Sequence, residues 1–532
     1  MLKTKMHPRE IYQRNQEFGL ENSANMLTEI IEQEKDNDKR KEAIKYLALI
    51  IDNSTSLKNE CFATFENLLI SDDKIEIKCE AAKALGRLKD EKALKPLKWI
   101  LDQTPVDYNI KIAVLKAIYK TRFEEPEIKL FINELDSSIN SIREYVSIQL
   151  LSLNPERLLT LLLDSLKNKK LSKKHKAELL KLIGYEISSI NVFFEDTSYL
   201  KTKYPEIFSD LIQNKNLILD VITQILKEED STLMDSAVTI LTLLGKDVEK
   251  EIIKLLLIDD FIVKKNAVLL CGRLKIKDAV DLLLSNLDNI YNEVTIAAIE
   301  ALGEIGDVSA VPELLNVLDI EDISFEYTDL DMKLYIIDAI KRIYQNNQNV
   351  SYEYLYDSLK KQNNTVRESV AFLLGEIGKD EFVKPLSDLL NVRNLDVKKN
   401  TIIALGKIGN IKPLEDLLKI VEDETVYWLI KKVSIDAIYN IFQNNWYKTK
   451  DDKQEITRTL HKNVANLADF LRTMESENYK VKLSIIKLLE NFGGEPVLGA
   501  LIKRVNDFHR VVRIYASNAI KKIEERLELE NS

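Results

Sequence analysis

The sequence contains few of the residues that cross-link or interrupt a fold. Its 532 residues include only 3 cysteines, 14 glycines and 10 prolines. Cys61, Cys79 and Cys271 are odd in number, widely separated and set among apolar residues, so we expect no disulfide framework and thiols that pack as small core residues in a reducing compartment. With 45% hydrophobic and 30% charged residues, this composition favours a helical soluble protein over a disordered or strand-rich one.

Long hydrophobic runs and an excess of positive charge are also missing. No apolar run approaches the roughly 20 residues that a membrane-spanning helix needs, and the first residues, MLKTKMHPREIYQRNQEFG, lack the apolar centre of a secretory signal. We therefore expect no membrane span and a cytoplasmic location. The 86 acidic residues outnumber the 76 basic ones, for a net charge of −10. This balance disfavours nucleic acid and anionic lipid as partners, although a local basic patch is compatible with it.

The motifs of common enzymes are absent. The sequence has no Gly-rich phosphate loop, no GxSxG elbow, no CxxC and no HExxH. Its four histidines are followed by Pro8, Lys176, Lys462 and Arg510, whereas a metal site needs several ligands that converge. We therefore predict no catalytic residue, no cofactor and no metal, and we expect that the chain is not an enzyme.

Residues 292–318, NEVTIAAIEALGEIGDVSAVPELLNVL, form one complete helix–turn–helix unit. Asn292 is expected to cap the first helix. Gly303 and Gly306 are expected to end it, where a missing Cβ permits a positive φ or a close backbone approach. Pro312 falls just inside the second helix, where a missing amide hydrogen costs little. Apolar residues at three- and four-residue spacings predict one buried stripe on the first helix: Val294, Ala297, Ala298, Ala301, Leu302 and Ile305.

Copies of this unit recur along the chain. Helix-ending positions 272 and 303 are 31 residues apart, as are 375 and 406, which is the range of short helical repeats. Because two short helices cannot bury their apolar faces alone, neighbouring units must stack. The shared pattern is V-R/K…A…ALG-x-IG…A-x-P-L…L, and it is clearest in five stretches: Ile77 to Leu101, Val263 to Leu287, Val294 to Leu318, Val366 to Leu390 and Val397 to Leu418.

This pattern resembles the HEAT-like repeat family, in the short variety also found in phycobilisome lyases. The resemblance implies an all-α fold, an armadillo-like α-solenoid of stacked helical hairpins. It further implies that the second helices line a concave face used to grip proteins. As an indication of function it is weak, because repeat folds of this kind carry many functions.

We predict six segments along the chain: an N-terminal lead-in or cap at 1–39, N-terminal repeats at 40–184, an aromatic-rich insert at 185–228, central repeats at 229–441 with an acidic insert at 319–331, a non-repeat helical segment at 442–478, and final repeats with a cap at 479–532. The insert at 185–228 is a hinge or a docking site, or its aromatic residues only pack it against the solenoid.

A basic residue usually stands eight positions before each helix-ending site. Two interpretations are open: the bases pair with neighbouring repeats and set the stacking, or they form a basic stripe for an acidic partner or a phosphate backbone. Thr295 and Ala237 are exceptions. The bases, called the basic ladder below, are Lys78, Lys111, Arg143, Lys176, Lys264, Lys333, Arg367, Lys398, Lys431, Lys482 and Arg513.

Three departures from the repeat are candidate partner-binding sites, because stacking does not explain them. They are an acidic, partly aromatic loop suited to a basic segment, a basic loop suited to acidic or phosphorylated groups, and a tryptophan beside lysines. The alternative is that they are solvated connectors or packing residues. The candidates are Asp319, Glu321, Asp322, Phe325, Glu326, Tyr327 and Asp329 in the acidic loop, Lys169, Lys170, Lys173 and Lys174 in the basic loop, and Trp446.

The sequence therefore predicts a non-enzymatic protein-binding solenoid that assembles or regulates a complex through its concave face. The expected contacts are exposed positions of the second helices and the two unusual loops. One alternative is a lyase-like or chaperone-like accessory protein related to the phycobilisome lyases, although no catalytic residue transfers from them. The other is nucleic-acid binding through the basic ladder. The sequence does not identify the partner.

Overall fold

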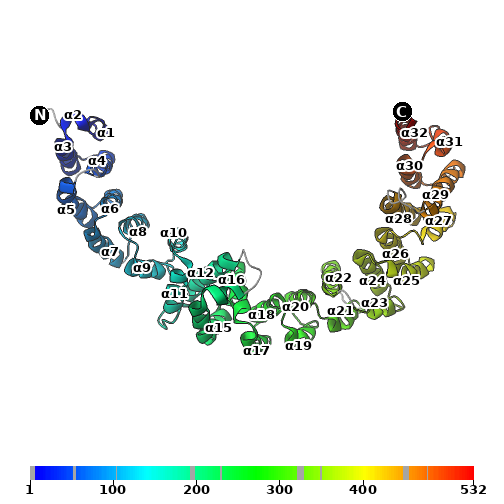
Figure 1. The fold of residues 1–532 in the computed structure, drawn as a ribbon, viewed down its shortest axis with the longest axis horizontal. Helices are drawn as coiled ribbons and strands as arrows, with labels where there is room; N and C mark the ends of the chain where they lie inside the picture. Colours follow the sequence, from blue (N-terminus) through cyan, green and yellow to red (C-terminus); the bar gives the residue numbers. More distant parts are fainter. Residues whose placement is uncertain are drawn as a thin grey trace. The chain divides into compact units, whose positions relative to one another are not determined.

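The computed structural model describes residues 6–51, 55–103, 105–191, 198–227, 230–319, 329–347, 350–446, 454–475 and 477–531. These residues form 32 α-helices and no strand (Figure 1). The prediction of an all-α solenoid is confirmed. The chain divides into two compact units, Met1–Glu251 (unit 1) and Ile252–Ser532 (unit 2), and each is described by itself.

Within unit 1, successive helices alternate between two layers (Figure 1). The first helices of the repeats are α4 (Asn37–Ile50), α6 (Ile75–Leu88), α8 (Tyr108–Thr121), α10 (Asn140–Leu150), α12 (Lys173–Asn191) and α16 (Ser231–Leu244). The other layer contains α3 (Leu20–Gln33), α5 (Thr55–Ser71), α7 (Leu94–Asp102), α9 (Glu125–Glu134), α11 (Pro155–Leu166) and α15 (Lys215–Ile225). The short helices α1 (Pro8–Gln13) and α2 (Asn15–Phe18) precede these layers, and α17 (Lys246–Leu255) crosses the unit boundary.

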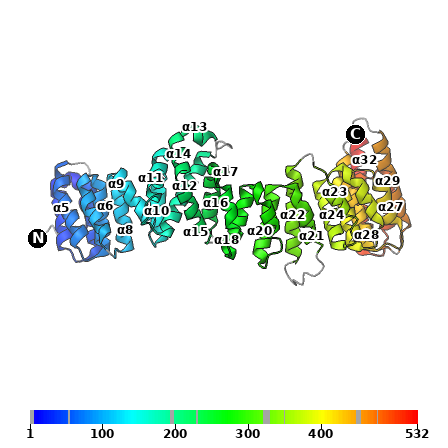
Figure 2. The same cartoon turned by 90° about the horizontal axis from the view of Figure 1, so that it is seen from below.

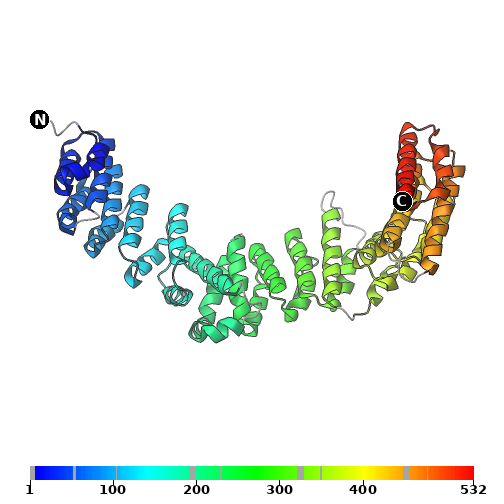
Figure 3. The same ribbon diagram turned by 45° about the horizontal axis from the view of Figure 1, so that its top comes forward.

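Unit 2 repeats the same alternation, and the helices of its last repeats stand side by side (Figure 3, yellow to red). Its first helices are α18 (Phe261–Arg273), α20 (Asn292–Ile305), α22 (Asp329–Asn346), α24 (Asn364–Ile377), α26 (Leu395–Ile408), α28 (Trp428–Trp446), α30 (Tyr479–Phe492) and α32 (Arg510–Asn531). Its second helices are α19 (Val280–Leu284), α21 (Val311–Val317), α23 (Glu353–Ser358), α25 (Val383–Asp388), α27 (Leu414–Glu422), α29 (Gln454–Thr473) and α31 (Leu498–Arg504).

The helices that lie on the inner side of each unit are not the ones expected from the sequence. Within each unit taken alone, the first helices lie on the inner side and the second helices on the outer side (Figure 1). The expectation that second helices line the concave face was therefore wrong. The hydrophobic pattern identifies two helices per repeat, but both have one buried stripe, so the pattern does not distinguish inner from outer.

The repeat that contains α20 shows how the recurring glycines act. Gly306 follows the helix with a φ of 75°, the left-handed conformation that glycine adopts without cost. Gly303 lies inside the helix instead, in its last turn. Asn292 is the first helical residue and its side chain caps nothing, because the N-cap position belongs to Tyr291. Pro312 falls in the first turn of α21, as predicted.

Interior glycines such as Gly303 allow successive first helices to approach closely. A Cβ added at Gly303 would lie 2.8 Å from the Cα of Ala339 on α22, and one at Gly406 would lie 2.8 Å from the Cα of Ala437 on α28. The glycine of each Ala-Leu-Gly sequence therefore packs against an alanine on the first helix of the next repeat. Other repeats use the same contact: Gly86 with Ala117, Gly272 with Ala301, and Gly375 with Ala404.

The segment 185–228 begins within α12 and continues through α13 (Ser198–Lys203), α14 (Pro205–Gln213) and α15. A Cβ on Gly184 of α12 would lie 2.6 Å from the Cα of Ser236 on α16, so these two first helices pack directly against each other. The additional helices α13 and α14 lie at one edge of the unit (Figure 2). The hinge and docking roles of this segment stay predictions.

The three cysteines are free thiols, of which Cys61 and Cys271 are buried. Burial raises the pKa of Cys61 and of Cys79 to about 11 and that of Cys271 to about 12, so all three are protonated at neutral pH. Among the helices described, none is long and apolar enough to cross a bilayer.

Candidate protein-binding surfaces

The basic ladder contributes to the stacking of repeats. Lys78 on α6 donates to the carbonyl oxygen of Ile70, at the end of α5, over 3.0 Å. Lys482 on α30 donates to the carbonyl oxygen of Glu475 and pairs with Asp507, both over 3.0 Å. Helix C-termini present unpaired carbonyls and a partial negative charge, which explains why a base is favoured there.

Five further ladder bases make comparable contacts within the stack. They are Lys111 with Glu134, Arg143 with the Ser137 carbonyl, Lys333 with Glu368, Lys431 with Glu477 and Arg513 with the Asp507 carbonyl. At the exceptional position Thr295, the hydroxyl lies 3.5 Å from the carbonyl oxygen of Asn286, which follows α19. These contacts favour the stacking interpretation over a basic stripe for a ligand.

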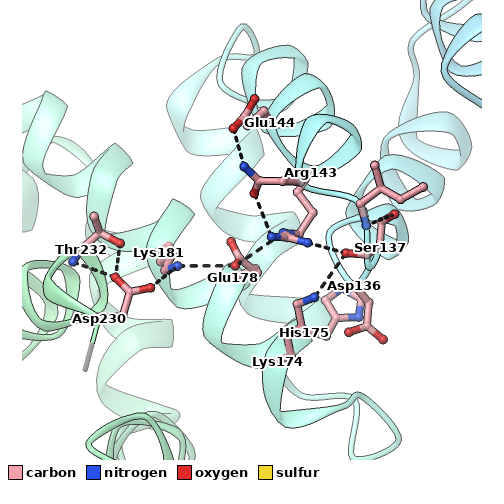
Figure 4. A network of polar contacts seen from close by, with 12 residues as sticks. Asp136, Ser137, Arg143, Glu144, Lys174, His175, Glu178, Lys181, Asp230 and Thr232 are labelled. Carbon is pink, nitrogen blue, oxygen red and sulfur yellow. Dashed lines mark hydrogen bonds and ion pairs between the residues drawn. The ribbon is translucent and has the colours of Figure 1, made fainter. Parts of the chain in front are cut away.

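One line of charges connects three first helices of unit 1 (Figure 4). Arg143 on α10 lies 3.9 Å from Glu178 on α12, and Glu178 lies 3.5 Å from Lys181. Lys181 pairs with Asp230 over 2.7 Å, and Asp230 in turn caps α16. The network therefore bridges α10, α12 and α16 and stabilises their register.

The Asp230 carboxylate predicts a pH-dependent stability. Burial alone would raise its pKa, but hydrogen bonds from Lys181 and Thr232 outweigh this and lower the pKa from 3.8 to about 2. Since the folded-state pKa is the lower one, the stabilisation is present above pH 3.8 and is lost as the pH falls toward 2. We expect Asp230→Asn, which can still cap α16, to lower the free energy of unfolding at pH 7 by about 1 kcal/mol, a value discounted for solvent screening.

Urea denaturation of the wild-type protein and the variant between pH 7 and pH 3 checks this expectation. The difference in unfolding free energy should narrow as the pH falls. Asp107→Asn is the matched control, because Asp107 caps α8 by accepting from the amides of Asn109 and Ile110. A difference for Asp230→Asn that is constant with pH would contradict the assignment.

Of the residues predicted for the acidic loop, only Asp319 and Asp329 lie within the described part of the chain. Asp319 pairs with Lys361 over 2.8 Å, and its carbonyl accepts from the side chain of Asn363. The hydrogen bond from Lys361 lowers the pKa of Asp319. Asp329 is the first residue of α22. The remaining predicted residues, Glu321, Asp322, Phe325, Glu326 and Tyr327, lie outside the described residues, so their docking role stays a prediction.

The predicted basic loop is exposed in unit 1. Lys169 and Lys170 lie in the turn between α11 and α12, and Lys173 and Lys174 lie in the first turn of α12. Lys174 donates to the Ser137 carbonyl over 3.4 Å. Cations near a helix N-terminus oppose the helix dipole, so helix formation does not explain this cluster. Its interpretation as a site for acidic groups stays a prediction.

Trp446 packs within unit 2. At the end of α28, its ring lies 5.1 Å from that of Phe492, 5.2 Å from that of His461 and 6.2 Å from that of Phe442, measured between centroids. These contacts provide a packing role for the ring, and a contact with a partner stays a prediction. Of the predicted candidates, the basic loop belongs to unit 1, and Asp319 and Trp446 belong to unit 2.

A hollow on the first helices of unit 2 combines lysines with aromatic rings. It has a volume of about 440 Å³ and spans α28, α30 and α32. We call it the basic–aromatic hollow, and it is lined by Lys432, Asp436, Tyr439, Asn440, Lys480, Leu483, Ser484, Lys487 and Tyr515. None of these residues was among the predicted site residues.

The charges of this hollow are only partly balanced. Asp436 pairs with Lys432 over 2.6 Å and accepts from Ser484 over 3.1 Å. Lys480 and Lys487 instead lie over aromatic rings, and within the described part of the chain neither ammonium has an ion pair. The hollow therefore carries two cations that are available to an acidic ligand.

Aromatic rings hold both of these lysines in place. The Lys480 ammonium lies 5.1 Å from the centroid of the Trp428 ring, and that of Lys487 lies 5.0 Å from the centroid of the Tyr439 ring. Such cation–π contacts are worth about 0.5–1 kcal/mol at exposed sites. Tyr515 flanks the hollow from α32 with 48% of its surface exposed.

The sequence contained one indication of this surface. Lys480 and Lys487 are seven residues apart, which places them on one face of a helix, two turns apart. The sequence does not show that Trp428 and Tyr439, from the preceding first helix, lie against that face. Among the described residues, no group of three or more His, Cys, Asp or Glu side chains could hold a metal ion.

Stacked helical hairpins, joined first helix to first helix through Gly–Ala contacts, define the class of α-solenoids. The HEAT-repeat family matches the sequence at residues 24–118, 250–325 and 352–438. The chain therefore contains HEAT repeats in these three regions. Comparison with curated proteins gives no significant match.

Several solved structures are similar to the chain. Importin β is 12% identical with a TM-score of 0.47, and the match covers 98% of this chain and 78% of importin β. Kap121p bound to Ste12p is 13% identical with a TM-score of 0.43, covering 94% of this chain and 56% of Kap121p. The CpcE–CpcF phycocyanin lyase from Nostoc sp. PCC7120 is 14% identical with a TM-score of 0.24, and the match covers 46% of this chain and 94% of the lyase chain.

Proposed function

We propose that the chain is a non-enzymatic, cytoplasmic protein-binding solenoid that assembles or regulates a complex. In this proposal the first-helix layer of unit 2 binds an acidic segment of a partner protein. This revises the expected contact surface from the second helices to the first helices, which lie on the inner side of the unit (Figure 1). It keeps the expected class of partner, a protein.

The observation that carries the proposal is the uncompensated charge of the basic–aromatic hollow. Lys480 and Lys487 are oriented by rings rather than neutralised by carboxylates. Long-range attraction of an acidic segment to such a patch speeds association, and the exposed ring of Tyr515 offers apolar contact area once the segment is bound. Aromatic side chains such as Tyr515 are enriched at protein interfaces, where they provide buried contact area.

The alternatives receive less support. Nucleic-acid binding through the basic ladder would need lysine and arginine side chains that are free to contact phosphates. Seven of the ladder residues instead contact carboxylates or backbone carbonyls inside the stack. A lyase-like or chaperone-like role has no observation in its favour beyond the repeat family.

Charge reversal in the hollow tests the proposal. We expect Lys480→Glu combined with Lys487→Glu to weaken partner capture at least about tenfold, because two attractive contacts become repulsive. The measurement is affinity purification with the full-length protein, followed by quantitative mass spectrometry of the proteins it retains. A stoichiometric protein that is lost with the double variant supports the proposal.

The matched control is Lys384→Glu combined with Lys412→Glu, on α25 and on the turn before α27, where both lysines are exposed. It changes the net charge by the same amount but leaves the hollow intact, so capture should be unchanged. Equal loss in both double variants, or recovery of nucleic acid alone that disappears steeply at raised salt, would overturn the proposal.

A further inference from the structure

We infer that the basic–aromatic hollow receives the acidic loop, residues 319–331, of a second copy of this chain. This inference rests on the proposed function, because it identifies the acidic segment that the hollow binds. It follows from the uneven distribution of charge along the chain, from the match between the loop and the hollow, and from the short reach of the loop within its own chain.

The negative charge of the chain is concentrated in one stretch. Residues 278–332 contain 14 of the 86 acidic residues and none of the 76 basic residues. The other 477 residues therefore contain 72 acidic and 76 basic residues, which is a small positive excess. The chain is acidic as a whole only because of this stretch, which contains α19, α20, α21 and the acidic loop.

The charge of this stretch is not neutralised by the chain around it. Nine acidic residues lie from Asp278 to Asp319, and within the described part of the chain only Asp319 among them has an ion pair. On α20, burial and the nearby Glu304 carboxylate raise the pKa of Glu300, because both disfavour its charged form. The stretch therefore attracts a basic surface of another molecule.

The acidic loop and the hollow are complementary in two kinds of side chain. The loop sequence, DIEDISFEYTDLD, places Phe325 and Tyr327 among six carboxylates and contains no basic residue. The hollow offers the cations Lys480 and Lys487, which lie over rings instead of carboxylates. Exposed apolar side chains beside the hollow share one face of α32: Val511, Ile514 and Tyr515. The carboxylates of the loop can thus pair with the lysines while its rings cover apolar surface.

The loop is too short to reach the hollow of its own chain. One end is Asp319, whose carbonyl accepts from Asn363 at the start of α24, and the other is Asp329, the first residue of α22. Each residue between them is at most five residues from one end, which is about 17 Å of extended chain. The two lysines lie on α30, three first-helix spacings from α24 and four from α22 (Figure 1). At 8–10 Å per spacing this is about 24–40 Å, so the loop must come from a second copy.

Sedimentation velocity of the full-length protein at low salt, over a range of protein concentrations, tests the inference. We expect the wild-type chain to self-associate and the association to weaken at raised salt, because the contact joins exposed charges. Lys480→Glu with Lys487→Glu makes the hollow repel the loop, and Glu321→Lys with Asp322→Lys makes the loop repel the hollow. Each double variant alone should raise the dissociation constant at least about tenfold.

Mixing the two double variants should restore the association. In the mixture, the acidic loop of one chain meets the intact hollow of the other, and the loop with lysines meets the hollow with glutamates. Misfolding of either variant does not produce such a rescue. The matched controls are Lys384→Glu with Lys412→Glu and Asp278→Lys with Asp288→Lys, which change exposed residues outside the hollow and the loop by the same charge. Both controls should preserve the association.

Four results would overturn the inference: a wild-type chain that is monomeric at every concentration, a loop variant that associates as the wild type does, a mixture that stays monomeric, or equal loss in the matched controls. If one of them occurs while Lys480→Glu with Lys487→Glu still eliminates capture of a different protein, the proposed function stands and only the identity of the partner is wrong. If that capture survives the charge reversal, the proposed function fails as well.

Discussion

Replacing Leu302 with Asp should destabilise unit 2 by about 3–5 kcal/mol, the largest effect that we expect of any single substitution in this chain. Leu302 is fully buried, and its helix α20 packs between the first helices α18 and α22. The substitution removes apolar contacts and places a carboxylate where no water reaches it. Because each repeat contacts only its neighbours, it should also uncouple the repeats on either side.

Thermal unfolding followed by circular dichroism checks this expectation in the full-length protein. The melting temperature should fall, and the transition should broaden or divide as the repeats lose cooperativity. Glu293→Asp is the control, because Glu293 is exposed in the same helix and a surface substitution usually changes stability by about 0.5 kcal/mol or less. A melting profile unchanged by Leu302→Asp would contradict the stacked-repeat arrangement.

Gly406→Ala should lower the unfolding free energy by about 1–3 kcal/mol, although alanine is the better helix former. A Cβ at Gly406 would lie 2.8 Å from both the Cα and the Cβ of Ala437, so α26 and α28 must separate to accept it. Gly499→Ala in α31 is the opposite case. A Cβ there would meet only the Arg472 side chain at 3.7 Å, an ordinary contact.

The two glycine substitutions should therefore differ in sign. Gly499→Ala is expected to stabilise the protein by about 0.5–1 kcal/mol, through helix propensity alone. Adding Ala437→Gly to Gly406→Ala should recover part of the loss, because it removes one of the two close contacts. Urea denaturation gives the unfolding free energy of the wild-type protein, of each single glycine variant and of the Gly406→Ala, Ala437→Gly double variant. Stabilisation by Gly406→Ala would show that the two helices are not in tight contact.

The helical repeats could be predicted from the sequence because two features that identify a helix, its hydrophobic spacing and its first residues, are local. Three- and four-residue spacings identify the buried stripe of α20, and Pro312 marks the start of the next helix. The sequence did not determine which of two glycines ends α20. Gly303 and Gly306 both fit a terminus in the sequence, but only Gly306 has a positive φ, while Gly303 serves the contact with Ala339.

The candidate binding surface could not be predicted in the same way. Lys480 has the spacing of an exposed residue, but the ring that orients it, Trp428, belongs to another repeat. Conversely, the basic ladder is conspicuous in the sequence, yet Lys482 is buried and paired with Asp507. Side chains with the same charge thus have different roles, and the neighbouring repeat decides which.

The sequence by itself determined the all-α class, the stacking of hairpins and the presence of HEAT-like repeats, because each depends on a periodicity that the chain repeats within about thirty residues. Only the tertiary structure decided that first helices lie on the inner side of each unit, that ladder bases bind helix ends, and that Lys480, Lys487 and Tyr515 share a hollow. These features depend on how side chains from separate repeats meet. The periodicity of one repeat does not show which groups of the neighbouring repeats these side chains contact.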